Sequence, residues 1–313
     1  MIYHFILNPK SGKKRAGFQY EDAIKSACQS RHLDYHIYYT TCVGDATAYV
    51  RSMVRISSDR QRFICVGGDG TLNELVNSAP SNPLVEFGVI PNGSGNDFVK
   101  NFTAPSQFYN IDAQIDGDTV SLDLIRCNDM YCMNMINIGF DCSVVKEASR
   151  LKKWKLVTPS MSYIFGVAVA LCKRFGTKMK IIFDDGEVIQ EEMTLTAIGN
   201  GRFCGGGFDS APRAFLNDGL MDVCAIRKIT RRKFIALVKD YKNGTYLSNP
   251  EAMKYIRYRQ VPHFRMEFDQ PIPICNDGEI CGGKSLEFTS VPNGFNFVLP
   301  KGSALRFPKR SDN

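Results

Sequence analysis

Carboxylates stand beside glycine-rich turns in this sequence, which is an unusual place for a negative charge. The stretch GGDGT at 67–71 follows an apolar run at 63–66 that predicts a short buried strand, and it precedes residues with helical periodicity. A strand, a glycine turn and a helix N-terminus together suit an anion, because backbone N–H groups and the helix dipole favour it. Asp69 would repel a phosphate there unless it holds a metal, orders water or takes a proton. Thr71 is expected to cap the helix that follows.

Two further loops have the same polar character. NPKSG at 8–12 follows the first apolar run, and PNGSGND at 91–97 follows a later one. We expect the backbone of the first loop to wrap phosphate, with Lys10 and Lys13 adding positive charge. Alternating strands and helices indicate a parallel sheet, in which ligands bind beyond the carboxyl ends of the strands. All three loops should therefore meet at one edge of a sheet.

Asp97 and Asp123 are expected to add negative charge at this edge. Asp97 ends the third loop, where the alternative is an N-cap for the residues that follow. Asp123 lies between Leu122 and Leu124 in an apolar strand, so its side chain is expected on the opposite face. With Asp69, these residues predict three carboxylates that converge on one cleft, where cations or ordered water would have to bridge them.

Asp277 and Glu279 are the best candidates for a general base. A hydroxyl that attacks a phosphoryl group needs an acceptor for its proton, and a carboxylate near the γ-phosphate can be that acceptor. A spacing of two along a strand would put both side chains on one face. Alternatively, Gly278 makes a turn between them.

The order of the apolar runs predicts a two-domain α/β plus β-rich protein. Strands and helices alternate up to about residue 126, which indicates a Rossmann-like nucleotide-binding domain over 1–126. Consecutive strands then indicate an antiparallel, sandwich-like domain over 127–294, with 295–313 rejoining the first domain. The elements expected first are strands at 3–8, 33–40, 63–66 and 87–90 and helices at 17–29 and 45–56. Those expected later are strands at 131–140, 179–185, 193–200, 220–227, 264–279 and 285–292 and helices near 143–175 and 230–247.

Composition places the chain among globular proteins with a large core. It has 313 residues, of which 44 % are hydrophobic. No apolar run is as long as a membrane span, and no signal peptide is expected at the N-terminus. Eleven cysteines without C-x-x-C spacing predict neither a disulfide framework nor a zinc knuckle, and His32 and His36 are interpreted as surface residues.

Positive charge is concentrated in two segments. The formal net charge is +7, and the segment 227–259 holds ten Lys and Arg residues against Asp240 and Glu251. Segment 151–174 flanks an apolar run with basic residues and contains the single tryptophan, Trp154. Both segments are typical of surfaces that bind anions such as acidic membranes. The alternative is a solvated helix face for 227–259 and packing of the helix against the β-rich domain for 151–174.

The motifs together resemble the signature set of the diacylglycerol kinase catalytic-domain family, in particular its soluble bacterial lipid kinases. The GGDG element alone is shared with NAD kinases and phosphofructokinases, so the specificity lies in five motifs that occur in the family's order over nearly the whole chain. They are NPKSG, GGDGTLNE, PNGSGNDFVK, NGRFCGGGFDSAPRAFLNDGLMDV and NDGE. The resemblance implies ATP-dependent phosphorylation of a lipid hydroxyl, of diacylglycerol to phosphatidic acid above all, in a cleft between the two domains.

The resemblance also implies roles for individual residues. Glu279 matches the family's proton acceptor, with Asp277 as a supporting group and Asp69 as a further catalytic carboxylate. Magnesium would be held by Asp218 and by backbone oxygens of Phe215 and Leu220, in a water network with Asp97 and Asp123. The residues predicted to bind ATP are Asn8, Pro9, Lys10, Ser11, Gly12, Thr40, Gly67, Gly68, Asp69, Gly70, Thr71, Leu72, Asn73 and Ser94.

The predicted cofactors are ATP and Mg²⁺, and the predicted partners are a lipid substrate and anionic phospholipid at a membrane surface, not nucleic acid. We expect a cytoplasmic protein that associates peripherally with the membrane and takes part in phospholipid synthesis; a homodimer is left open. Two rival functions remain, an NAD kinase-like small-molecule kinase and a catalytically silent lipid- or nucleotide-binding module. The NGSGNDF motif argues against the first. The intact candidate base, Glu279, argues against the second.

Overall fold

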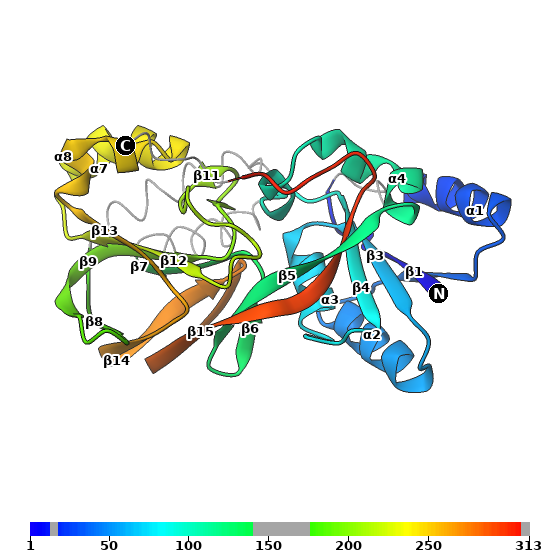
Figure 1. Cartoon of the computed structure of the whole chain (residues 1–313), viewed down its shortest axis with the longest axis horizontal. Coiled ribbons are helices and arrows are strands. Elements are labelled where there is room, and N and C mark those ends of the chain that lie inside the picture. The colour runs from blue at the N-terminus through cyan, green and yellow to red at the C-terminus, as the bar shows by residue number, and fades with distance from the viewer. Residues whose placement is uncertain (13–17, 140–175, 308–313) are drawn as a thin grey trace. The chain divides into compact units, whose positions relative to one another are not determined.

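The computed structural model describes residues 1–12, 18–139 and 176–307, which fold into two units (Figure 1). Two strands, β5 (Asp118–Cys127) and β15 (Glu279–Leu299), run from one unit into the other. Lys13, the predicted helix near 143–175 and the basic segment 151–174 lie outside the described residues. The first unit comprises Met1–Leu124, Leu216–Asp218 and Val291–Phe307, and the second comprises Ile125–Phe215 and Gly219–Ser290.

The first unit is built on a parallel sheet, as the alternating sequence pattern predicted. Its strand order is β2-β1-β3-β4-β15, and every neighbouring pair is parallel. β3 and β4 are buried along their whole lengths because helices cover both faces of the sheet. The strands are β1 (Ile2–Leu7), β2 (Tyr35–Tyr39), β3 (Gln61–Gly67) and β4 (Val85–Pro91), and the α-helices are α1 (Glu21–Ser30), α2 (Asp45–Ile56), α3 (Asp69–Val76) and α4 (Ile111–Ile115). Shorter elements of the chain up to residue 132 are the 3₁₀ helices η1 (Phe18–Tyr20), η2 (Phe98–Asn101) and η3 (Pro105–Tyr109) and the strand β6 (Met130–Cys132).

Alternation along the strands divides the apolar side chains between the two faces of this sheet. Ile64 and Val66 pack with Ile24 of α1 and Ile115 of α4 on one face. Helices α2 and α3 lie on the other side (Figure 1). The loops that follow β1, β3 and β4 are thereby fixed to a rigid support.

Helix α3 begins earlier than the sequence predicted. The amides of Thr71 and Leu72 both donate to the carbonyl of Gly68, at 3.0 and 3.2 Å, so Gly68 is the N-cap residue and Asp69 the first helical one. The prediction of Thr71 as the cap is therefore wrong. Its hydroxyl instead accepts a hydrogen bond from Asn8 Nδ2 at 3.0 Å.

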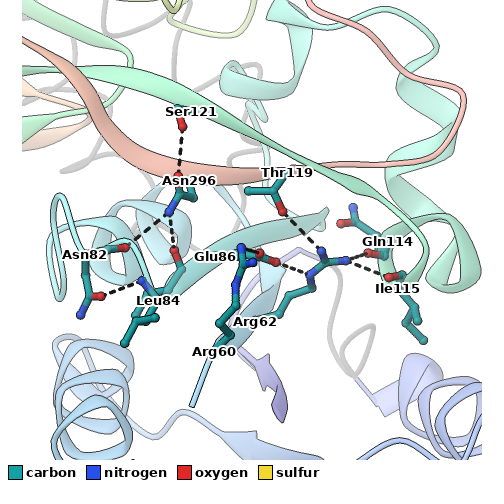
Figure 2. Close-up of polar contacts among 11 residues, drawn as sticks. Arg60, Arg62, Asn82, Leu84, Glu86, Gln114, Ile115, Thr119, Ser121 and Asn296 are labelled. Atoms are coloured by element: carbon teal, nitrogen blue, oxygen red, sulfur yellow. Dashed lines mark hydrogen bonds and ion pairs between the residues drawn. The ribbon is translucent and has the colours of Figure 1, made fainter. Parts of the chain in front are cut away.

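A buried ion pair joins β3 to β4 near the amino ends of these strands (Figure 2). Arg62 Nε lies 2.7 Å from Glu86 Oε2, and the two residues are 5 % and 1 % exposed. Arg62 also donates to the carbonyls of Gln114 and Ile115 at 3.2 and 2.8 Å, while the largely exposed Arg60 reaches Glu86 Oε1 at 2.9 Å. The network satisfies both buried charges at the edge opposite the glycine loops.

The second unit is antiparallel throughout its described strand pairs, in agreement with the predicted β-rich domain. Its strands are β7 (Met135–Gly139), β8 (Thr177–Phe183), β9 (Val188–Gly199), β10 (Phe203–Cys204), β11 (Phe208–Asp209), β12 (Met221–Arg227), β13 (Ile256–Val261), β14 (His263–Asn276) and the first half of β15. Its helices are α7 (Arg231–Asn243), η4 (Tyr246–Ser248) and α8 (Pro250–Met253).

Strand β12 separates two apolar cores in this unit. Val223 and Ala225 face a core between strands, whereas Cys224 and Ile226 face a second core under α7. This period of two places apolar residues on both faces, so β12 is buried almost throughout. Helix α7 is thereby fixed on the outside of the sheet.

Two further observations bear on the sequence predictions. The nine cysteines among the described residues are free thiols. Within the same residues, the structure contains no helix that is long and apolar enough to cross a membrane.

Candidate active site

The three predicted loops meet at the carboxyl edge of the parallel sheet. Asn92 links all of them: its amide donates to the carbonyl of Gly67 at 2.7 Å, and its carbonyl accepts from Ser11 Oγ at 2.9 Å. The loops after β1, β3 and β4 therefore form one connected surface, as expected from their positions after parallel strands.

Glycines allow these loops to pack backbone against backbone. A Cβ atom added to Gly93 would lie 2.5 Å from the Cα of Gly68, and one added to Gly12 would lie 2.4 Å from the carbonyl oxygen of Asn92. Gly12 also has a φ of +69°, which other residues rarely adopt. Around Gly70, by contrast, an added Cβ would meet no atom within 4 Å. The loops thus leave no room for a side chain where they pack against each other, whereas the turn at Gly67–Thr71 has free space beside Gly70.

Asp69 connects two of the loops through its carboxylate. Oδ2 accepts from the amide of Asp97 at 3.0 Å, and Oδ1 accepts from the amide of Phe98 at 3.1 Å. Burial and the nearby charge of Asp97 raise the pKa of Asp69, while these two amides and the charge of Lys100 act in the opposite direction. The protein therefore neutralises the negative charge of Asp69 only in part. A carboxylate in this state suits a site that binds further charged groups.

Asp97 stands at the N-cap position of η2, which was the alternative for it. Its side chain makes no capping hydrogen bond to η2. Instead, Oδ1 accepts from Lys100 Nζ at 2.5 Å, and the same ammonium group donates to the carbonyl of Gly95 at 2.9 Å. Asp97 is 8 % exposed, so it supports Asp69 from a buried position.

The first loop is ordered by its own polar residues. The amide of Lys10 donates to Asn8 Oδ1 at 3.0 Å, and the amide of Ser11 donates to the carbonyl of Asn8 at 3.1 Å. The exposed side chain of Lys10 donates to the carbonyl of Thr41 at 2.6 Å, directly after the predicted nucleoside contact Thr40. Lys10 is thus held at the edge of the site, where it can meet an anion.

The other residues predicted to bind ATP differ in accessibility. Ser94 is exposed at the tip of its loop, and Gly70 is exposed beside Asp69. Leu72 is fully buried and Asn73 is 6 % exposed, because both side chains face into the unit from α3. A contact of Leu72 with a nucleotide would therefore have to come from its backbone.

Sequence reasoning missed three residues of this edge. Asn92 joins the loops, Asn96 Oδ1 accepts from the amide of Gly93 at 2.9 Å, and Lys100 binds Asp97. Asn96 has a φ of +48°, a conformation that asparagine tolerates better than most residues. The signals were present as asparagines flanking glycines and as a lysine three residues after an aspartate.

Asp123 is held by hydrogen bonds to the backbone of two other segments. It is 2 % exposed; its amide donates to the carbonyl of Leu216 at 2.7 Å, and its Oδ1 accepts from the amide of Asn293 at 2.9 Å. Among the described residues, no three His, Cys, Asp or Glu side chains are grouped as metal ligands would be. The structure brings Asp69 and Asp97 together, and the convergence of Asp123 with them through cations or water stays a prediction.

The predicted metal residues lie on the turn that Asp123 holds. Asp218 is exposed in the turn after Leu216, and Phe215 and Leu220 are half-buried on either side of it. One exposed carboxylate with neighbouring carbonyl oxygens fits the hard oxygen ligands of Mg²⁺, which usually keeps several waters. The residues present are thus compatible with that ion.

Asp277 and Glu279 are separated by a turn, not spaced along one strand. Asp277 and Gly278 have φ values of +45° and +92° and connect the paired residues Asn276 and Glu279. Two residues with positive φ make the tight hairpin turn that fits the twist of antiparallel strands. The interpretation with both carboxylates on one strand face is wrong, and the turn alternative is confirmed.

The two carboxylates have different surroundings. Asp277 accepts from the amides of Met133 and Met135, at 2.7 and 2.9 Å, which fixes its side chain against the start of β7. Burial, with a smaller contribution from the Asp277 charge, raises the pKa of the Cys132 thiol. Glu279 is exposed, and within the described part of the chain its carboxylate forms no hydrogen bond or ion pair. Glu279 is therefore the more accessible of the two carboxylates.

Comparisons with known proteins agree with this architecture. Residues 3–127 match the model of the diacylglycerol kinase catalytic domain, and residues 134–299 match that of the YegS C-terminal NAD kinase beta sandwich-like domain. The chain is 27 % identical over 299 residues to the diacylglycerol kinase of Staphylococcus carnosus, covering 95 % of this chain and 94 % of the relative. It is 27 % identical over 305 residues to a "Probable lipid kinase YegS-like" of Yersinia enterocolitica, covering 96 % and 97 %. The crystal structure of a diacylglycerol kinase from Bacillus anthracis strain Sterne superimposes with a TM-score of 0.69 at 20 % identity, covering 95 % and 96 % of the two chains, which shows the shared fold.

Proposed function

This chain belongs to the diacylglycerol kinase catalytic-domain family of lipid kinases, and from that premise we propose that it transfers the γ-phosphate of ATP to a primary hydroxyl of diacylglycerol. The relatives named diacylglycerol kinase in Staphylococcus carnosus and Bacillus subtilis align over almost the whole chain, which favours this acceptor over other lipids. The observation that carries the proposal is the carboxylate of Asp69, held between two glycine loops at a helix N-terminus.

In the proposed reaction the first unit binds the triphosphate. Phosphates lie against the backbone amides of the glycine turn at Gly67–Thr71 and of the loop at Asn8–Gly12, and Lys10 supplies positive charge. Asp69 and Asp97 keep the two loops at a fixed separation, because the Asp69 carboxylate bonds to the backbone of the next loop. Positioning of this kind is the main contribution that a protein makes to phosphoryl transfer.

The second unit supplies the proton acceptor in this proposal. The lipid hydroxyl oxygen forms a bond to the γ-phosphorus, the bond from that phosphorus to the β,γ-bridging oxygen breaks, and ADP leaves. Glu279 takes the hydroxyl proton, and Asp277 holds the turn that presents it. Mg²⁺, held by Asp218 and the backbone oxygens of Phe215 and Leu220, would neutralise charge that develops on the phosphates.

A lipid panel tests the proposed acceptor. The protein is incubated with radiolabelled ATP and Mg²⁺ and offered dioleoylglycerol, a monoacylglycerol, a sphingoid base, phosphatidylglycerol and NAD in parallel, and products are resolved by chromatography. We expect labelled phosphatidic acid as the main product, and loss of the label in a Glu279→Gln variant. Preferential labelling of NAD would replace the lipid acceptor with the rival kinase function, and labelling of no acceptor would favour a binding module.

The magnesium assignment has a test that does not depend on activity. Binding to the native state alone raises the melting temperature by mass action. We expect Mg²⁺ to raise the melting temperature of the wild-type protein and to have little effect on Asp218→Asn. An equal response in both proteins would move the metal to another site.

A further inference from the structure

Helix α7 begins and ends with well-formed caps and buries one of its faces. The Thr230 side chain accepts from the amide of Lys233 at 3.3 Å, and Gly244 closes the helix with a φ of +63°. At about 100° per residue, Phe234 and Tyr241 fall on the same side, and both are buried against the sheet. The helix therefore has a fixed orientation and a defined outer face.

The outer face of α7 is cationic with an apolar residue at its centre. It contains four Lys or Arg side chains and no acid. Ile235 is 60 % exposed in the middle of these charges, where it contributes nothing to the core. The exposed residues of this face are Arg231, Arg232, Ile235, Ala236, Lys239, Lys242 and Asn243.

The acids near α7 are occupied on its other side. Asp240, the one acid of the helix, is half-buried and accepts from Asn249 Nδ2 at 2.6 Å. Glu251 interacts with Lys233 at 3.6 Å and with Lys254. Within the part of the chain that the structure describes, no carboxylate oxygen lies within 4 Å of the charged groups of Arg232 or Lys239. Arg232 and Lys239 thus place positive charge on the outer face without a carboxylate partner among the described residues.

The sequence of α7 also opposes its own helix dipole. The first turn contains Arg231 and Arg232 and no acid, although an acid there would stabilise the helix. Helix α1 shows the usual arrangement, with Glu21 and Asp22 in the first turn and a Glu21–Lys25 ion pair at 2.6 Å. A face that was merely solvated would be expected to resemble α1.

The inner side of α7 contacts a segment that belongs to the family motif. A Cβ added to Gly244 would lie 2.5 Å from Asp209 Oδ2, and Tyr246 Oη donates to the carbonyl of Ser210 at 2.8 Å. Asp209 is itself in a buried ion pair with Arg202 at 2.6 Å. The C-terminal end of α7 is therefore packed directly against this segment.

From these observations we propose that the outer face of α7 is a membrane-docking surface for anionic phospholipid. The inference rests on the proposed function, because a kinase for a water-insoluble hydroxyl must meet its substrate at an interface. The four cations lie at the level of anionic headgroups, and Ile235 enters the boundary between headgroups and acyl chains. The charge complementarity favours this occupant, and nucleic acid, which would not use Ile235, is an outcome of the test.

Vesicle sedimentation with a charge-reversal variant tests the docking surface. The full-length wild type and Arg232→Glu/Lys239→Glu are mixed with vesicles of phosphatidylcholine alone or with a minority of phosphatidylglycerol, at low and physiological salt. Each cation near an anionic surface strengthens binding roughly fivefold, so we expect the variant to bind anionic vesicles on the order of tenfold more weakly or worse. Ile235→Ser should lose less, and the loss should persist at high salt.

A matched control is the variant Lys178→Glu/Lys284→Glu, which makes the same change in net charge at exposed positions elsewhere in the second unit. It should bind vesicles nearly as the wild type does. The α7 variant should keep its melting temperature or gain slightly, because a glutamate in the first turn suits the helix dipole. Its activity on a short-chain, monomeric diacylglycerol should be unchanged, while the apparent KM for vesicle substrate rises.

The results separate this proposal from the proposed function. Equal vesicle binding by the wild type and the α7 variant overturns the docking surface, whatever lipid the enzyme phosphorylates. Equal losses of vesicle binding in the α7 and control variants would show that only net charge matters. That result would also overturn the docking surface. Loss of duplex DNA binding with unchanged vesicle binding would assign the face to nucleic acid. If the wild type phosphorylates no lipid but still binds anionic vesicles through α7, the docking surface stands and the proposed function fails.

Discussion

The two edges of the parallel sheet contain buried or half-buried carboxylates in opposite situations. At the amino edge, Glu86 faces two guanidinium groups and is sealed from water (Figure 2). At the carboxyl edge, Asp69 has two backbone amides and a second carboxylate, Asp97, beside it. The first charge is fully compensated by the protein, and the second is not.

Structural and functional charges in this unit differ in how completely the protein neutralises them. A buried charge with a complete set of partners adds little net stability but makes the fold depend on every partner. A charge whose pKa is raised by burial and by a like charge stays costly until something else enters the site. The Arg62–Glu86 pair belongs to the first kind, and Asp69 belongs to the second.

The largest effect on stability is expected from removing the charge partner of Arg62 at the amino edge of the sheet. In Glu86→Ala the buried guanidinium of Arg62 loses its charge partner, which should lower the free energy of unfolding by about 3–5 kcal/mol. The melting temperature should fall on the order of 10 °C. Arg60→Ala is the matched control, because Arg60 is 57 % exposed in its side chain and should cost no more than about 1 kcal/mol. Equal losses in the two variants would contradict the distinction between them.

The carboxyl edge should respond in activity and not in stability. In Asp69→Asn the side chain can accept only one of the two amide hydrogen bonds well, and it no longer repels Asp97. We expect kcat to fall about 100-fold, equivalent to about 2.7 kcal/mol in the transition state, with a melting temperature within a few degrees of the wild type. Retention of more than about a tenth of kcat would remove Asp69 from the catalytic machinery.

The sequence predicted this edge well, because its signals are local. Glycine turns after apolar runs fix where a chain leaves a parallel sheet, and those runs placed Gly67–Thr71 and 91–97 correctly. The bonds from Asp69 to the amides of Asp97 and Phe98 could not be predicted, since they join residues 28 and 29 positions apart. Only the folded sheet brings those loops together.

The Arg62–Glu86 ion pair at the amino edge could not be predicted from the sequence for the same reason. Strand β3 was expected to begin at Phe63, because Gln61 and Arg62 are polar and a buried strand favours apolar residues. In the structure the strand begins at Gln61, and Arg62 is buried because Glu86 lies on the neighbouring strand. The local sequence pattern around Arg62 cannot indicate a partner that lies 24 positions away.

The turn at Asp277 shows a different limit. Period-two spacing and a tight turn are both compatible with the letters NDGE, and the amides of Met133 and Met135 decide between them by holding Asp277. The roles of Glu279 and Asp218 stay predictions, carried by the family and by their exposure.

A smaller effect concerns how stability changes with pH at Asp69. Its pKa in the folded state lies above the ordinary value of 3.8, so the folded protein binds the proton more tightly than the unfolded chain. As the pH falls through the folded-state pKa, the wild type should gain stability relative to Asp69→Asn, which cannot titrate. Denaturant unfolding of both proteins from neutral pH toward about pH 4.5 measures this difference. A constant difference would show that the carboxylate is already compensated at neutral pH.

The smallest effect is expected at an exposed cluster in the second unit, where water does most of the compensation. His263 lies 2.7 Å from Asp184 and 3.1 Å from Glu287, and its pKa is raised, mainly by the hydrogen bond to Asp184. A raised histidine pKa contributes stability that is complete below the unfolded value of about 6.5 and is lost as the pH rises through the folded-state pKa. Because all three side chains are at least one-third exposed, the contribution should stay below about 1 kcal/mol. The difference in unfolding free energy between the wild type and His263→Gln should therefore shrink slightly between about pH 6 and pH 9, and added salt should shrink it further. A change as large as that of Glu86→Ala would mean that exposure does not decide how much a charge cluster contributes, and the contrast between the two edges would need another cause.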